Sequence, residues 1–294
     1  MLCMIVIPAG STIENQVCWL FDINEAHSTF QYRDIVDHNV QVDYAVRYIL
    51  EELGVEVEDP QVDYLDTILE PFLQTGFPST VQFSRVARST LITACPIEQP
   101  DYALIAWMEH EERLFKRLER HIIAKVLESG FSDVEGFLRY SLSVQNRRKA
   151  RVGQALENHL EEIFLANQIR YTRGAITENK AKPDFVFPCI DAYRDSTFSD
   201  NKLTMLGVKS TCKDRWRQVL TEAKRIHAKH LLTLEPAISL NQTAEMQANS
   251  LQLVLPSKLH ETYADQQRKW LLTLQGFIML LRERQSNRGY PYHC

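Results

Sequence analysis

Apolar side chains recur at helical spacing from Ala103 to Leu127, and Gly130 follows where a helix C-terminus favours glycine. Ser132 and Asp133 then offer the short polar side chains that begin a helix. A further amphipathic helix is predicted from about Lys149 to Leu165. This part of the chain is therefore expected to be mainly helical and to support the fold rather than carry a functional site.

The pattern changes after Asn167, where short β-rich runs alternate with turns and helices. Helices are predicted over Asp214–His227 and Ile278–Arg284. Short strands flanked by helices favour an α/β fold with a small mixed sheet. The predicted strands are Phe185–Phe187, Leu203–Val208, Leu231–Leu234 and Leu251–Leu255.

The segment before this region reads as a separate small unit. Met4–Pro8 and Val17–Phe21 are predicted as strands, and Val42–Leu53 as a helix. The breaker residues at 76–79 mark a boundary, which divides the chain into residues 1–76 and 77–294.

The net charge of −5 is unevenly distributed along the chain. Residues 1–76 hold 14 acidic and 2 basic residues, which gives −12, and the remaining 24 acidic and 31 basic residues give +7. A basic body favours a polyanionic partner, although charge blocks are also common on ordinary solvated faces. The acidic unit is either an arm that could cover a basic cleft or the remnant of a larger domain.

The composition, 45% hydrophobic and 24% charged, is that of an ordinary globular protein. No apolar run is long enough for a membrane span, and the opening residues lack the basic flank of a secretory signal, so a cytoplasmic location is expected. No cysteine pair has the two-residue spacing of a zinc ribbon.

Three charged residues of the β-rich region have a spacing that suits phosphodiester hydrolysis. Asp184 precedes one predicted strand, Lys209 ends the next, and Glu222 lies on the helix that follows. Two carboxylates can hold Mg²⁺, and a lysine can orient water or stabilise phosphate oxygens. The alternative is a set of solvated surface charges that contribute roughly 0–1 kcal/mol.

The residues after Lys209 add a possible reading surface for DNA. Lys213 and Arg215 carry donors that suit guanine, and Asp214 carries an acceptor that suits cytosine. Asp214 would equally serve as a helix cap, with the basic residues merely solvated.

Residues from about Phe77 to Leu281 resemble the catalytic domain of the EcoRII-type restriction endonucleases, a branch of the PD-(D/E)XK nuclease superfamily. The resemblance rests on three runs of sequence. They are Ser143–Arg151, Lys182–Pro188 and, above all, Val208–Gln218.

The resemblance implies a PD-(D/E)XK fold and a Mg²⁺-dependent active site. Asp184 and Glu222 would hold the metal, the second acid having moved from the position of Val208 to the helix, and Lys209 would position water. Glu157 matches an accessory glutamate, and Tyr193 matches a tyrosine suspected of an active-site role, although it could equally pack over a hairpin.

The resemblance also implies a substrate and partners. The family cuts double-stranded DNA ahead of the first cytosine of CCWGG, as a homodimer, in a system with a cognate cytosine methyltransferase. Lys213, Asp214 and Arg215 align with the residues that read the site, and the nearby Arg217 is a further candidate contact. Phosphate contacts are expected from Arg147, Arg148, Lys149 and Arg151, unless these simply begin a solvated helix. Alternatives are a repair or mobile-element nuclease of relaxed specificity and a DNA-binding protein that has lost catalysis.

Overall fold

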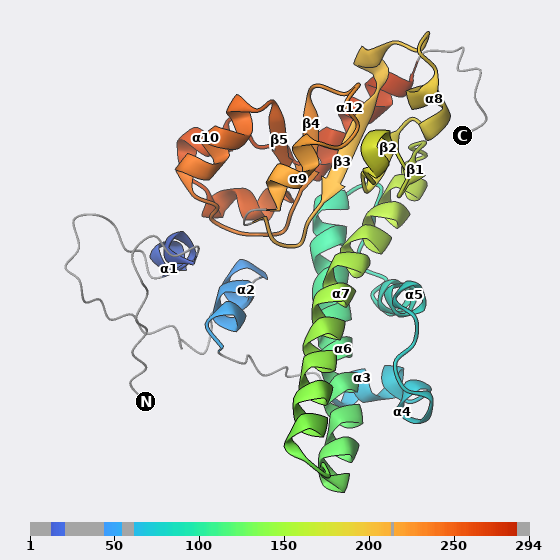
Figure 1. The fold of residues 1–294 in the computed structure, drawn as a ribbon, viewed down its shortest axis with the longest axis vertical. Helices are drawn as coiled ribbons and strands as arrows, with labels where there is room; N and C mark the ends of the chain where they lie inside the picture. Colours follow the sequence, from blue (N-terminus) through green and yellow to red (C-terminus); the bar gives the residue numbers. More distant parts are fainter. Residues whose placement is uncertain (1–12, 21–43, 55–61, 213–214, 287–294) are drawn as a thin grey trace, which may run out of the picture.

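The computed structural model describes residues 13–20, 44–54, 62–212 and 215–286. A five-stranded mixed sheet lies at one end of two long helices (Figure 1). None of the described helices is long and apolar enough to cross a membrane. The prediction of a small mixed sheet flanked by helices is confirmed.

The sheet has the strand order β1-β2-β3-β4-β5, antiparallel from β1 to β3 and parallel from β3 to β5. Every residue of the three middle strands is buried. This explains why β2 and most of β3 read as apolar runs, whereas β4 begins with the buried polar residues Lys229 and His230. The strands are β1 Thr172–Arg173, β2 Phe185–Phe187, β3 Thr204–Val208, β4 Lys229–Leu232 and β5 Leu251–Val254.

Two helices form a long antiparallel hairpin that carries the sheet at one end (Figure 1). Helix α6 spans Pro100–Ser129, and α7 spans Val134–Ala166 with its N-terminus capped by the Asp133 carboxylate. The prediction of a separate helix beginning near Lys149 is therefore wrong, because nothing between Val134 and Ala166 interrupts the hydrogen-bond ladder. At the sheet end, Phe164 packs edge-on against both Phe185 and Phe187.

The remaining elements cover the sheet and the sides of the hairpin. Helix α12 packs on the face that carries Phe187 and His230, through Phe277. Helix α9 packs on the opposite face, through Val219. The helices are α5 Thr80–Thr90, α8 Ile190–Arg194, α9 Trp216–Leu220, α10 Leu240–Ala248, α11 Asp265–Arg268 and α12 Leu274–Gln285, with 3-10 turns at Glu178–Lys180, Asp200–Lys202 and Ser257–Thr262.

Two sequence expectations fail in this part of the fold. The helix predicted over Asp214–His227 is confined to α9, because the chain turns after Leu220 and Ala223 adopts a positive φ of 45°. The strand predicted at Val17–Phe21 is wrong, because residues 17–20 lie in helix α1, Glu14–Leu20, and Phe21 lies outside the described residues. The strand predicted at Met4–Pro8 lies outside the described residues.

Three described helices lie between residues 44 and 75. They are α2 Tyr44–Glu52, α3 Val62–Leu69 and α4 Phe72–Thr75, of which α3 and α4 pack on α6. Leu69 and Phe72 share a buried cluster with Phe83 and Phe115, so packing is continuous across residue 76. On α2, Glu51 forms an ion pair of 2.5 Å with Lys116. The division into residues 1–76 and 77–294 stays a prediction.

Gly207 allows the close approach of α9 to β3, and its replacement should destabilise the fold. A Cβ atom there would lie 2.8 Å and 3.1 Å from the two methyl groups of the buried Val219. We expect Gly207→Ala to lower the free energy of unfolding by about 1–3 kcal/mol in urea denaturation.

The matched control is Gly153→Ala on α7, where no atom lies within 4 Å of the added methyl group. Alanine favours the helix there, so the control should raise stability by roughly 0.5–1 kcal/mol. Equal unfolding midpoints for the two variants would contradict the close packing of α9 on β3.

Candidate active site

Asp184 and Lys209 form an ion pair at the edge of the sheet where β2 begins and β3 ends. Because β2 and β3 are antiparallel, the start of one lies beside the end of the other. The Lys209 ammonium donates to Asp184 Oδ2 at 2.8 Å, and the backbone N–H of Val208 donates to the same oxygen at 2.6 Å. The two side chains are only 16% and 11% exposed, so the ion pair is largely shielded from solvent.

Glu222 adds a second carboxylate to this edge. It follows α9 in a turn, and its Oε2 is buried with no hydrogen-bond partner among the described residues. Burial raises the pKa of Glu222 to about 7; Lys209 and Lys229 oppose this shift, and the Asp184 charge contributes to it. Charges that influence one another in this way lie close together.

Glu157, on α7, adds a third carboxylate within electrostatic reach of Asp184 and Lys209. Burial raises its pKa, and repulsion from Asp184 adds to the effect, while Arg173 and Lys209 oppose it. The structure therefore brings Glu222 and Glu157, which lie 65 residues apart in the sequence, each within electrostatic reach of the Asp184–Lys209 pair.

The donor set of this cluster fits a hard divalent cation. Glu222 Oε2 is a buried acceptor without a donor, as a metal ligand is before the metal binds. No group of three His, Cys, Asp or Glu side chains within the described residues is arranged as a ready-made metal cage. Mg²⁺ needs no such cage, because it usually keeps several waters and uses one or two carboxylates with substrate phosphates.

Tyr193 lies behind the turn that carries Glu222. Its hydroxyl donates to the two oxygens of Glu178 at 2.7 Å and 2.6 Å, and it accepts from the backbone N–H of Arg225 at 3.3 Å. Burial raises the pKa of Tyr193, and the hydrogen bond to Glu178 adds to the effect. Its contacts are thus with the chain just after Glu222.

The basic residues predicted to contact DNA have different surroundings. Arg215 is exposed at the start of α9, whereas Arg217 stacks on Trp216 and pairs with Glu245 at 2.8 Å. Lys213 and Asp214 lie outside the described residues. Cys212, the described residue before them, donates its backbone N–H to Glu235.

The basic run on α7 is only partly available to DNA. Arg148 pairs with the buried Glu119 at 2.6 Å, and Lys149 is exposed. Arg151 is buried and paired with Glu111 and Glu112, so the expectation that it contacts phosphate is wrong. A helix buried on one side must turn one in three or four of its side chains inward.

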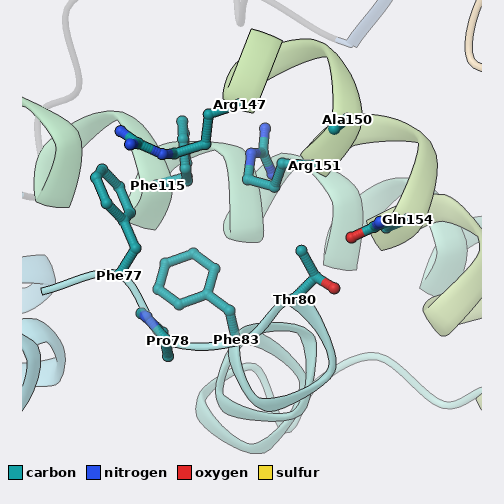
Figure 2. Close-up of a pocket in the computed structure, with 9 residues that line it drawn as sticks. All are labelled: Phe77, Pro78, Thr80, Phe83, Phe115, Arg147, Ala150, Arg151 and Gln154. Carbon is teal, nitrogen blue, oxygen red and sulfur yellow. The ribbon is translucent and has the colours of Figure 1, made fainter. Parts of the chain in front are cut away.

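Arg147 lines a cavity of about 190 Å³ between α5, α6 and α7. Figure 2 shows its guanidinium beside Phe77, and the two groups lie 4.4 Å apart. Arg151 lies 4.2 Å from the Phe115 ring in the same cavity. The remaining lining residues are Pro78, Thr80, Phe83, Ala150 and Gln154.

Sequence reasoning missed two cations that support the carboxylates. Arg173 donates to Glu157, and the buried Lys229 donates to the carbonyls of Ala223 and Ile226 at 3.1 Å and 2.6 Å in the turn after Glu222. One signal was present for the first: glutamates one helical turn apart, at 157 and 161, repel unless a cation lies between them.

Comparisons with known proteins agree with this geometry. Residues 115–278 match the family model described as EcoRII C terminal. The chain is 44% identical over 180 residues to the type II restriction enzyme EcoRII of Escherichia coli. The aligned residues cover 61% of this chain and 45% of that protein. The chain thus spans less than half the length of this curated relative.

Solved structures of restriction endonucleases share the fold. Metal-depleted Ecl18kI in complex with uncleaved DNA has a TM-score of 0.62 at 18% identity, covering 78% of this chain and 87% of that one. The complex of restriction endonuclease PspGI with substrate DNA has a TM-score of 0.60 at 14% identity, covering 74% and 96%. The prediction of a PD-(D/E)XK fold is confirmed.

The raised pKa of Glu222 predicts a pH-dependent cost in stability. An acid whose pKa rises on folding, here from 4.5 to about 7, favours the fold while it is protonated, and this contribution is lost as the pH rises through 7. We expect Glu222→Gln, in EDTA, to be more stable than the parent at pH 8 by about 1 kcal/mol after allowance for solvent screening.

The two proteins should have equal stability near pH 4, where Glu222 is neutral. Thermal unfolding across this pH range is the measurement, and Glu261→Gln at an exposed site is the control. A Glu222→Gln effect that does not change with pH would contradict the buried, unpartnered carboxylate.

Proposed function

Since this chain belongs to the EcoRII C-terminal family, we propose that it is a type II restriction endonuclease that hydrolyses double-stranded DNA with Mg²⁺. One observation carries the proposal. The Asp184–Lys209 ion pair lies within electrostatic reach of Glu222, whose buried Oε2 has no hydrogen-bond partner among the described residues.

Asp184 and Glu222 are the proposed metal ligands. When bound, Mg²⁺ would lower the pKa of a water molecule and neutralise charge on the scissile phosphate. The Lys209 ammonium is held by Asp184 Oδ2 at 2.8 Å, in position to donate to the attacking water or to a phosphate oxygen. Glu157 is the proposed accessory acid, since its carboxylate shares the field of Asp184 and Lys209.

Tyr193 has a proposed supporting role. Its hydroxyl accepts from the Arg225 N–H, and Glu178, which accepts from Tyr193, also accepts from the Lys224 N–H at 3.4 Å. These bonds hold the chain immediately after Glu222, and so Tyr193 would act on the metal site through the position of that turn.

The proposed target is a CCWGG-like site, cut before the first cytosine on each strand. Lys213, Asp214 and Arg215 are the proposed base readers, and the exposure of Arg215 supports this role. Arg147, Arg148, Lys149 and Arg217 are proposed phosphate contacts. A palindromic outer sequence favours a homodimer with one active site per strand.

The proposed biological setting follows from the substrate. Such an enzyme would act in the cytoplasm on unmodified DNA, alongside a cognate cytosine methyltransferase that protects the host sites. The methyltransferase would be a partner in function and not a bound subunit.

Digestion of unmodified plasmid DNA with Mg²⁺ or EDTA, followed by sequencing of the ends, tests the proposed function. We expect a single five-base site and matching overhangs with Mg²⁺ only. Scattered ends would favour a repair or mobile-element nuclease, and binding without cleavage would favour a protein that has lost catalysis.

Removal of the central ion pair should abolish cleavage but spare binding. We expect Asp184→Ala and Lys209→Ala each to lower the single-turnover rate by about 100-fold to 1000-fold or more. Each variant loses a group that stabilises the transition state. Gel-shift titration in EDTA should give a dissociation constant close to that of the parent.

The control is Asp191→Ala, which removes an exposed acid from α8. It should cleave like the parent. A Lys209→Ala variant with near-parental turnover would remove Lys209 from the proposed mechanism.

Arg215 should contribute to sequence discrimination. We expect Arg215→Ala to lose about 1–3 kcal/mol of preference for G·C over A·T at one recognised step, measured by competition between duplexes. Lys258→Ala, at an exposed site on another part of the fold, is the control. Equal weakening on all sequences would make Arg215 a phosphate contact only.

A further inference from the structure

Arg173 lies on β1 and connects the sheet to α7. Its guanidinium donates to Glu157 Oε2 through Nε at 3.2 Å and Nη2 at 2.9 Å. Nη1 donates to Glu161 at 2.7 Å and to Asn158 at 2.9 Å. The Arg173 side chain is 25% exposed, so these charge-assisted bonds are partly shielded from water.

Both bonds to Glu157 fall on the same oxygen. Among the described residues, no group donates a hydrogen bond to Glu157 Oε1. Two donors on one oxygen fix the position of that oxygen and leave the other oxygen for a further ligand.

The same strand that carries Arg173 also holds the backbone of Asp184. Arg173 pairs with Phe185 in the register of β1 and β2, and the N–H of Gly174 donates to the Asp184 carbonyl at 2.9 Å. The position of Glu157 relative to Asp184 is therefore set by the paired backbones of β1 and β2 and by the guanidinium of Arg173.

We propose that Arg173 is a positioning residue, whose guanidinium orients the Glu157 carboxylate toward Asp184 and Lys209. This inference rests on the proposed nuclease function. Arg173 need not touch DNA or metal, because it acts through Glu157. Its loss should therefore slow cleavage without weakening the binding of DNA.

A purely structural role would have different consequences. Arg173 also joins Asn158 and Glu161, so it could serve only to fix α7 to the sheet. In that case its removal would lower stability and DNA binding, and the loss of activity would not depend on whether Glu157 is present.

The test is a double-mutant cycle of Arg173→Met and Glu157→Gln in the full chain. We expect Arg173→Met to slow single-turnover cleavage about 100-fold, as misplacement of a reacting group by about 1 Å does. In the Glu157→Gln background, Arg173→Met should cause no further loss, because the two changes remove the same contribution.

Two further variants separate orientation from charge and from packing. Arg173→Lys keeps the charge and one donor, and should recover about tenfold of the lost rate, since a lysine lacks the fork. Glu161→Gln removes the other acidic partner of Arg173 and should cleave like the parent. Gel-shift titration in EDTA and thermal unfolding of every variant provide measurements that do not depend on cleavage.

An additive cycle, or a loss of DNA binding that matches the loss of rate, would overturn the inference while the nuclease function stands. If the parent itself cleaves no DNA, the proposed function fails. A crystal structure of Arg173→Met then decides the orientation: Glu157 turned away from Asp184 supports the positioning role, and an unmoved Glu157 overturns it.

Discussion

The two hydrogen bonds that Asp184 Oδ2 accepts are the constraint on which the rest of the site depends. The Val208 N–H and the Lys209 ammonium both donate to it, at 2.6 Å and 2.8 Å. One oxygen thereby fixes the end of β3 against the start of β2 and places a positive charge beside a negative one. Because a carboxylate removed from water must be paired, the fold and the chemistry share the same interaction. Any substrate that enters this edge meets a charge arrangement already in place.

Two cations outside the central pair support the outer acids in different ways. Arg173 donates hydrogen bonds directly to the carboxylate of Glu157, whereas Lys229 donates to backbone carbonyls of the turn after Glu222. Glu157 is thus held through its side chain and Glu222 through its backbone. The second arrangement leaves a Glu222 oxygen without a donor, which suits a ligand whose partner arrives with the substrate.

The sequence predicted strands β2, β3 and β5 well, because their residues are mostly buried and form largely apolar runs between turns. The placement of Glu222 on a long helix failed, since the positive φ of Ala223 is a local backbone choice without a glycine to signal it. The strand at Val17–Phe21 failed because an apolar run of five residues fits a helix equally well. Arg173 was missed because its two acidic partners lie on another element, the preceding helix α7, at 16 and 12 residues' separation. Ion pairs between elements depend on the tertiary structure. In the sequence, only the expected repulsion between Glu157 and Glu161 indicated that a cation lies near them.

The uninterrupted course of α7 has a consequence for how this protein tolerates insertions. Arg147 at the cavity and Glu157 at the acidic cluster lie ten residues apart on one helix, about 15 Å along its axis. One residue added or deleted between them would rotate one group relative to the other by about 100° around that axis. Homologues are therefore expected to differ in length at the ends of this helix and in the loops of the sheet, but to keep the spacing between these two positions unchanged.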